Sequence, residues 1–209
     1  MRDLPAAALA LLIAAAPAMA QAPKMPTSPP GSPDPAKIVA GSYQIEAAHT
    51  QVVFALDHLG FSIFRGILSQ ASGTLTLDPK APAAAKLSVT VPIASVYTSS
   101  KKLDEELVSA NWFDAAKFPN ATFVSTRVTP AANPQEWSTV DGNLTIHGVT
   151  RPVTMKVHFH GAGPAMMAAG NALGFDGRIG LSRSEFGLGQ GVPLVSDHVE
   201  LTIAAAFQQ

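Results

Sequence analysis

The stretch VTMKVHFH, residues 153–160, is a clear example of the pattern that indicates the fold class. Apolar side chains occupy every second position, at Val153, Met155, Val157 and Phe159, and polar side chains lie between them. Alternation with a period of two is typical of a β-strand that turns one face to a core and the other to solvent. The stretch therefore predicts a half-buried strand.

The same alternation recurs along the chain, at 74–77, 87–93, 144–146 and 199–203. Turn-forming pairs separate these stretches: Asp78-Pro79, Asn133-Pro134, Asp141-Gly142 and His147-Gly148. About eight short strands joined by such turns predict an all-β domain, either a sandwich or a closed antiparallel barrel.

One segment breaks the pattern. Residues 101–119, KKLDEELVSANWFDAAKFP, place Leu103, Leu107 and Ala110 at helical spacing, and Pro119 follows them. The acidic run from Asp104 to Glu106 lies near the start, where a helix dipole favours negative charge. We expect one short helix inserted in the β domain, and no catalytic carboxylate pair, because consecutive helix positions point in different directions.

Composition excludes several classes of function. The chain of 209 residues has 14 Lys and Arg against 15 Asp and Glu, and no block of basic residues, so a nucleic-acid partner is not expected. Because the chain has no cysteine, it has no disulfide framework, thiol nucleophile or Cys-ligated zinc.

The first residues predict export. An apolar run from Ala6 to Ala16 precedes an A-x-A pattern at 18–20, and the run is shorter than the roughly 20 residues that span a bilayer. We expect a signal peptide at 1–20 and no stable membrane insertion. Residues 21–40 are rich in proline and predict a disordered linker, or less simply a ligand for a partner domain. The folded domain is expected at 41–209.

Two other features have a simple and a functional interpretation. His158 and His160 share one strand face and could reach one metal ion, but Lys156 lies on that face too, and an exposed outer wall is the simpler interpretation. The Gly-rich run from Gly161 to Gly174 predicts a long mobile loop, either a plain hairpin or a flap over a cavity.

His58 and Arg183 each end an apolar stripe. His58 continues the face of Val52, Phe54 and Leu56, and Arg183 continues that of Phe175, Ile179 and Leu181. In one interpretation both groups are satisfied by their own protein at the edge of the core. In the other they form a polar station for a ligand head group at the mouth of an apolar cavity, since an eight-stranded barrel can enclose one small ligand.

Six motifs, in order between Tyr43 and Phe207, carry a family resemblance. They are Glu46-x-x-His49-Thr50, the HLGFS of 58–62, the helical 103–114, Phe118-Pro119 with 123–125, the GNLTIHGVTRPV of 142–153, and the RSEFG of 183–187. The chain resembles the YceI-like family of exported, lipocalin-like barrels that bind polyisoprenoid lipids. Leu103, Glu106 and Asn111 depart from the family's Arg, His and Asp in the helical motif.

The resemblance implies an antiparallel, lipocalin-like, eight-stranded β-barrel in the periplasm. It implies a binding or carrier protein for an amphiphilic lipid with a long apolar chain, such as a polyprenyl phosphate or an isoprenoid quinone, with no other cofactor. An enzyme that acts on such a lipid and an envelope interaction protein are the alternatives, and the sequence leaves a homodimer open. The predicted ligand-binding residues are His58, Arg183, Phe54, Leu56, Phe61, Phe113, Phe123, Met155, Phe175 and Phe186.

Overall fold

A computed structural model describes residues 27–133, 136–166 and 169–209. The predicted signal peptide lies outside the described residues. Within them the chain forms ten strands and one α-helix. The strands are β1 (Gly41–Ile45), β2 (Gln51–His58), β3 (Ser62–Leu68), β4 (Ser72–Leu77), β5 (Lys86–Pro92), β6 (Asn120–Thr129), β7 (Ser138–Ile146), β8 (Val149–Pro164), β9 (Asn171–Ser182) and β10 (His198–Gln208). The helices are α1 (Lys101–Leu107) and the short 3₁₀ turns η1 (Pro35–Lys37), η2 (Ala47–His49), η3 (Pro82–Ala84), η4 (Ile93–Ser95) and η5 (Arg183–Phe186).

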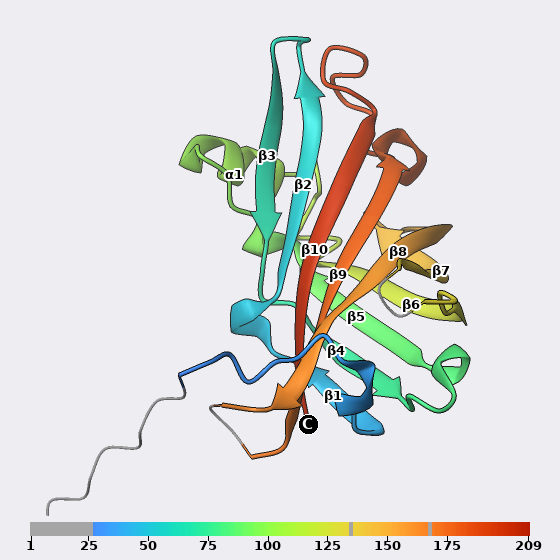
Figure 1. Ribbon diagram of the computed structural model, residues 1–209. Coiled ribbons are helices and arrows are strands. Elements are labelled where there is room, and N and C mark those ends of the chain that lie inside the picture. The colour runs from blue at the N-terminus through green and yellow to red at the C-terminus, as the bar shows by residue number, and fades with distance from the viewer. Residues whose placement is uncertain (1–26, 134–135, 167–168) are drawn as a thin grey trace, which may run out of the picture.

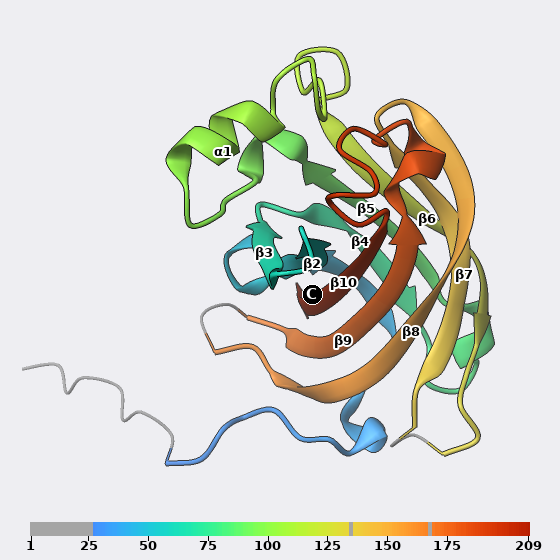
Figure 2. The same cartoon turned by 90° about the horizontal axis from the view of Figure 1, so that it is seen from above.

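Eight of the strands close into an antiparallel barrel. The order runs β1-β4-β5-β6-β7-β8-β9-β10, and β10 pairs back onto β1 through Ile45 and Phe207. Figure 2 shows the strands curving around one interior. The predicted eight-stranded antiparallel barrel with one inserted helix is therefore confirmed. Every alternating stretch named above lies in a strand, except that Ile93, at the end of 87–93, begins η4.

The hairpin of β2 and β3 extends the wall beyond this ring. After the turn of η2, β2 pairs with β10 from Gln51 to Ala55, and β3 pairs with β2 on its other side. Figure 1 shows the hairpin rising past the other strands, with α1 beside β3. A bridge between Ile67 and Tyr97 joins β3 to the segment that precedes α1. Thus the helical segment, rather than a strand, covers the open side of the hairpin.

The helix is shorter than its sequence pattern predicts. The hydroxyl of Ser100 accepts a hydrogen bond from the Leu103 N–H and caps the start of α1. The helix ends at Leu107, and turns replace it up to Phe118. Leu107 and Phe113 pack against the cluster around Ile93, so this segment is held by its tertiary contacts, as short helices generally are.

The pair Asp141-Gly142 was expected to form a turn, and that expectation is wrong. Both residues lie inside β7, in register with β8. Gly142 is needed there because the ring of Phe123 lies where a Cβ atom would be. The separate turn predicted at His147-Gly148 is present between β7 and β8. The φ values of these two residues, 52° and 74°, are the left-handed pair of a tight hairpin.

The described part of the proline-rich segment is not a free tether. Ser32 and Ala162 exchange two backbone hydrogen bonds of 2.9 Å, and Asp34 caps η1. We call residues 27–40 the N-terminal strap, and Figure 1 shows it crossing the lower part of β8. Its approach depends on Gly161 and Gly163, because a Cβ atom on Gly163 would overlap the Pro30 carbonyl oxygen. Part of the predicted linker is thus an ordered arm on the barrel.

The prediction of a long mobile loop at 161–174 is wrong, because Gly161 and Gly163 both lie within β8. Strand β8 continues to Pro164 and β9 begins at Asn171, so only 165–170 connect them, and 167–168 lie outside the described residues. The glycines at 161 and 163 allow a third chain segment to pack against the strand. The glycines here, which are typical of loops, instead allow two backbone segments to pack closely.

Candidate ligand cavity

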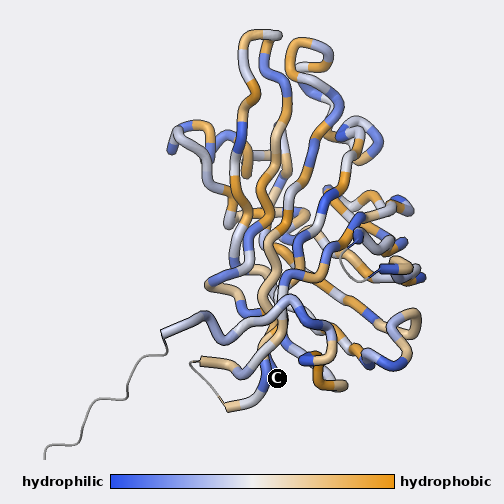
Figure 3. Tube along the Cα trace, viewed as in Figure 1, coloured by the Kyte–Doolittle hydropathy of each residue, from blue (hydrophilic) through white to orange (hydrophobic). Residues whose placement is uncertain are grey.

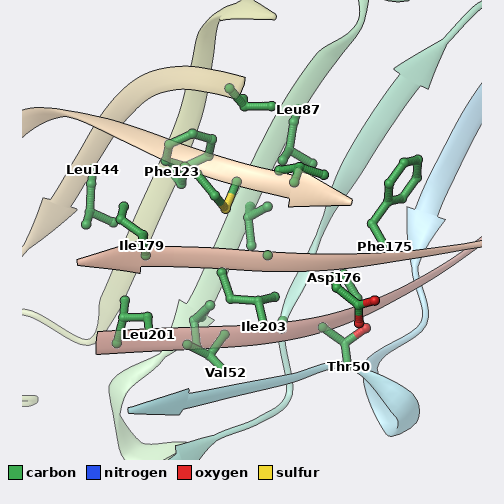
Figure 4. A pocket seen from close by; sticks show the side chains of 18 of the residues that line it. Thr50, Val52, Leu87, Phe123, Leu144, Phe175, Asp176, Ile179, Leu201 and Ile203 are labelled. Atoms are coloured by element: carbon green, nitrogen blue, oxygen red, sulfur yellow. The ribbon is translucent and has the colours of Figure 1, made fainter. Parts of the chain in front are cut away.

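The barrel contains a cavity of about 500 Å³. Figure 4 shows Phe123 of β6, Ile179 of β9, and Leu201 and Ile203 of β10 directed into the same space. This volume lies within the range of roughly 300–1,000 Å³ that is typical of small-molecule sites. The interior of the barrel can therefore hold a ligand as well as side chains.

Alternate residues of the strands line the cavity, as the period-two pattern requires. The lining is almost entirely aliphatic and aromatic, and its strand residues include Val52, Phe54, Leu56, Leu75, Leu77, Leu87, Val89, Val91, Phe123, Val140, Leu144, Met155, Val157, Phe159, Phe175, Ile179, Leu181, Val199, Leu201, Ile203, Ala205 and Phe207. Pro35 and Ile38 of the N-terminal strap and Trp112 and Phe113 after α1 also contribute to it. Such a surface favours an apolar ligand over water.

The polar side chains at the cavity have partners within the protein. The Thr50 hydroxyl accepts from the Ala206 N–H at 3.0 Å, and the Trp112 indole donates to Glu106 at 3.1 Å. Among the described residues, no buried side-chain nitrogen or oxygen lacks a hydrogen bond. Lys86 and Glu136, which also border the cavity, are exposed residues outside the barrel strands' interior faces. The interior wall thus presents mainly carbon atoms to the cavity.

Arg183 is the one charged side chain that is buried among the described residues, with 6% exposure. Its Nε donates to the Ser196 carbonyl at 2.9 Å, and its Nη2 donates to the Val195 carbonyl at 2.8 Å. Its Nη1 donates to the carbonyl oxygens of Leu188 and Gln190. All four acceptors belong to the β9–β10 connection, residues 187–197, so Arg183 holds that connection in shape.

The charge of Arg183 is only partly compensated. Burial lowers the pKa of the guanidinium below its ordinary value, and the nearby Asp197 carboxylate raises it. Asp197 in turn accepts hydrogen bonds of 2.8 Å from the backbone N–H and the hydroxyl of Ser184. These bonds lower the pKa of Asp197. The two ends of the connection are therefore fixed by one buried cation and one hydrogen-bonded anion.

Two glycines shape the cavity wall. Gly66 lies directly across from Phe54 in the β2–β3 pair, and a Cβ atom there would overlap the Phe54 ring. Gly142 makes the same room for Phe123 on the neighbouring strand of the β6–β7 pair. A large ring over a glycine keeps the aromatic side chain against the wall.

The profile of the YceI-like domain matches residues 43–207 of this chain. The chain belongs to the YceI-like family. It is 36% identical over 173 residues to a UPF0312 protein of Pseudomonas fluorescens. The aligned region covers 80% of this chain and 87% of that protein.

Solved structures of this type share the fold. BcnA of Burkholderia cenocepacia superposes with a TM-score of 0.67 at 27% identity, over 78% of this chain and 98% of BcnA. A domain from Saccharophagus degradans described as polyisoprenoid-binding superposes with a TM-score of 0.58 at 14% identity, over 79% of this chain and 97% of that domain. The second likeness concerns the fold alone.

Six of the ten predicted ligand-binding residues lie on the cavity of this YceI-like chain: Phe54, Leu56, Phe113, Phe123, Met155 and Phe175. Arg183 also borders the cavity, but its guanidinium donates hydrogen bonds to the β9–β10 connection. In the structure these donors hold a loop, in place of the polar station for a ligand head group that the parity of Arg183 suggested. The alternation would also have identified β5 and β10 as lining strands. No sequence signal points to Pro35 and Ile38, which reach the cavity only because the strap folds back.

The other three predicted residues lie elsewhere. His58 is exposed at the end of β2, where the hairpin has passed the rim, and its backbone bridges to Val195. Phe61 is 89% exposed at the hairpin turn. Phe186 is 1% exposed and packs in the core cluster with Phe123, rather than on the cavity. Parity gave the correct face for His58 but could not show where the barrel ends.

The remaining polar candidates lie outside the cavity. His160 is exposed and its Nδ1 lies 3.1 Å from the Asp176 carboxylate, while the ring centroid of His158 lies 5.5 Å from that of Trp137, with the two rings tilted. The outer-wall position predicted for both histidines is confirmed. In the described part of the chain, no group of three or more His, Cys, Asp or Glu is arranged to hold a metal ion. No helix in that part is long and apolar enough to cross a membrane.

Proposed function

We propose that this YceI-like protein is an exported carrier that holds one long apolar lipid of the isoprenoid type inside its barrel. The observation that carries the proposal is the apolar cavity of about 500 Å³, whose interior polar groups are already bonded to the protein. The description of the Saccharophagus degradans domain as polyisoprenoid-binding supports the choice of lipid. The predicted signal peptide at 1–20 supports export to the periplasm.

The energetics favour recognition of the chain of the lipid. Each buried methylene contributes about 0.8 kcal/mol, so a chain of about fifteen carbons offers roughly 12 kcal/mol before ordering costs. Phe54, Leu56, Phe113, Phe123, Met155 and Phe175 are the proposed chain contacts. A phosphate or quinone head group would lie toward the rim, where water can still reach it.

Binding, rather than catalysis, fits this lining. An enzyme needs a nucleophile, a base or a metal that converges on the reacting atoms. Among the described lining residues, the titratable side chains are Lys86, Glu136, Asp176 and Arg183, and Arg183 is engaged with backbone carbonyls. We therefore propose a carrier that releases its ligand unchanged.

The test is mass spectrometry of an organic extract of the protein purified from the periplasm. We expect one prenyl lipid or isoprenoid quinone per protein. In a companion Ile203→Trp variant, the indole would fill the cavity and the lipid should fall at least tenfold, because Ile203 lines it. Thr202→Trp is the matched control, since Thr202 is exposed on the same strand. An extract without lipid, or equal lipid in both variants, would overturn the proposal.

A further inference from the structure

Exposed apolar side chains gather at one end of the molecule. Ten large hydrophobic residues are exposed among those described, and five of them lie in two loops or, for Ile63, at the adjoining start of β3: Leu59, Phe61, Ile63, Val192 and Leu194. We call these five residues the apolar tip. Single exposed apolar residues are ordinary, but a group of them marks a contact surface.

The two loops of the tip are joined to each other. The Leu59 N–H donates to the Leu194 carbonyl at 2.8 Å, and the Ser196 N–H donates to the Asp57 carbonyl at 2.9 Å. Figure 1 shows the β2–β3 turn and the β9–β10 connection side by side at the top of the molecule. Figure 3 colours stretches of both loops as hydrophobic. The tip is thus one projecting surface built from two chain segments.

The same loops border the cavity. Val195, next to Leu194, lines it, and so does Leu56, two residues before His58. Arg183 fixes the connection that bears Val192 and Leu194 through bonds to the carbonyl oxygens on either side of them. These bonds therefore hold the conformation of the loop in which Val192 and Leu194 are exposed.

The tip carries little charge. No Asp or Glu occurs from His58 to Leu77 or from Phe186 to Ser196, and Arg65 is the one Lys or Arg in these two stretches. Arg65 is exposed on β3. The carboxylate of Asp57, at the base of the turn, accepts a hydrogen bond from the Gly60 N–H at 2.7 Å. An apolar projection whose own residues carry no acid, and which lies next to an apolar cavity, suits the acyl region of a bilayer.

We propose that the apolar tip docks on a phospholipid bilayer and inserts Phe61 and Leu194 between the head groups. The choice of a bilayer rests in part on the proposed lipid binding, because an isoprenoid lipid resides in membranes. Docking places one end of the cavity, the end lined by Leu56 and Val195, at the membrane surface. The ligand would then pass between bilayer and barrel with little of its chain exposed to water.

The test uses vesicles of phosphatidylethanolamine and phosphatidylglycerol with protein from the full-length chain. We expect the wild type to co-sediment with them and the Phe61→Ser/Leu194→Ser double variant to bind about tenfold more weakly. Val124→Ser is the matched control, because Val124 is 50% exposed on the outer wall of β6. A dye on Ser62→Cys should shift to the blue on binding, while one on Ser88→Cys of β5 should not, and the chain has no other cysteine.

Several outcomes would overturn the proposal. They are a wild type that does not bind vesicles, equal binding by the tip and wall variants, and a dimer that the tip substitutions convert to monomer, since the tip would then contact a second copy. The Ile203→Trp variant separates this proposal from the proposed function. Vesicle binding that depends on the tip, without any lipid in the organic extract, would keep the docking surface and refute the lipid carrier.

Discussion

The Nη2 of Arg183 lies 2.8 Å from the carbonyl oxygen of Val195, twelve residues further along the chain. This bond, with three more from the same guanidinium, ties the end of β9 to the connection that borders both the cavity and the apolar tip. The side chain that parity places toward a ligand is therefore used to fold a loop.

Replacing Arg183 with alanine should destabilise the protein. Four carbonyl groups would lose their donor, and hydrogen bonds to charged groups contribute about 1.5–3 kcal/mol each, so we expect a loss of at least about 3 kcal/mol in the free energy of unfolding. Urea denaturation measures it. Arg151→Ala is the control, because Arg151 is exposed on β8. A change below about 1 kcal/mol would mean that the connection holds its shape without Arg183.

The head group of the lipid should matter less than its chain. With the Arg183 donors bonded to the protein, we expect a prenyl phosphate and the prenol of equal chain length to bind within about tenfold of each other. Titration of the delipidated protein with both compounds measures the difference. A preference for the phosphate of about a hundredfold would instead indicate a charged station, and His58→Ala would then test whether the exposed histidine supplies it.

Acid should loosen the β9–β10 connection through Asp197. The backbone N–H and the hydroxyl of Ser184 hold the pKa of Asp197 below its ordinary value. Since the folded-state pKa is lower than that of the unfolded chain, about 3.9, this stabilisation is present above that pH and is lost as the pH falls through the folded-state pKa. The urea midpoint of Asp197→Asn should therefore fall less than that of the wild type between about pH 5 and about pH 2. Parallel curves would contradict this assignment.

The wall of the cavity should be sensitive to a single methyl group. Gly66→Ala would push the Phe54 ring off the wall and into the cavity, and we expect a loss of about 1–3 kcal/mol in stability together with weaker lipid binding. Gly31→Ala is the control, because no atom lies within 4 Å of the added Cβ atom there. Thermal unfolding and lipid titration of both variants give the comparison. Equal stability would show that Phe54 can move at little cost.

The N-terminal strap should detach when β8 gains a side chain at Gly163. The valine of Gly163→Val would overlap the Pro30 carbonyl, so the Ser32–Ala162 bridge should open. We expect faster hydrogen exchange at the Ser32 amide and new protease cleavage between 27 and 40. Gly174→Ala on β9 is the control, since its added Cβ atom makes only ordinary contacts. Unchanged exchange at Ser32 would place the strap's anchor elsewhere.

Local sequence patterns were sufficient to predict most of the architecture. Alternation is a local property of each strand, so residues such as Val153, Met155 and Leu201 revealed strands and inner faces without knowledge of the partner strands. The six ordered motifs added the closed barrel and the family. The positions of Phe54, Phe123 and Phe175 on the cavity followed from the same reasoning, because the inner face of a closed barrel surrounds its interior.

The roles of the polar and glycine residues, in contrast, depend on contacts made only in the folded chain. The acceptors of Arg183 lie in a connection that follows it in the chain. Gly163 leaves room for Pro30, which lies more than a hundred residues earlier. His58 lies beyond the rim because β2 extends past the ring of strands. Each of these depends on contacts between distant segments. The pattern within one strand shows which face a side chain occupies, but only the folded chain shows what that face meets.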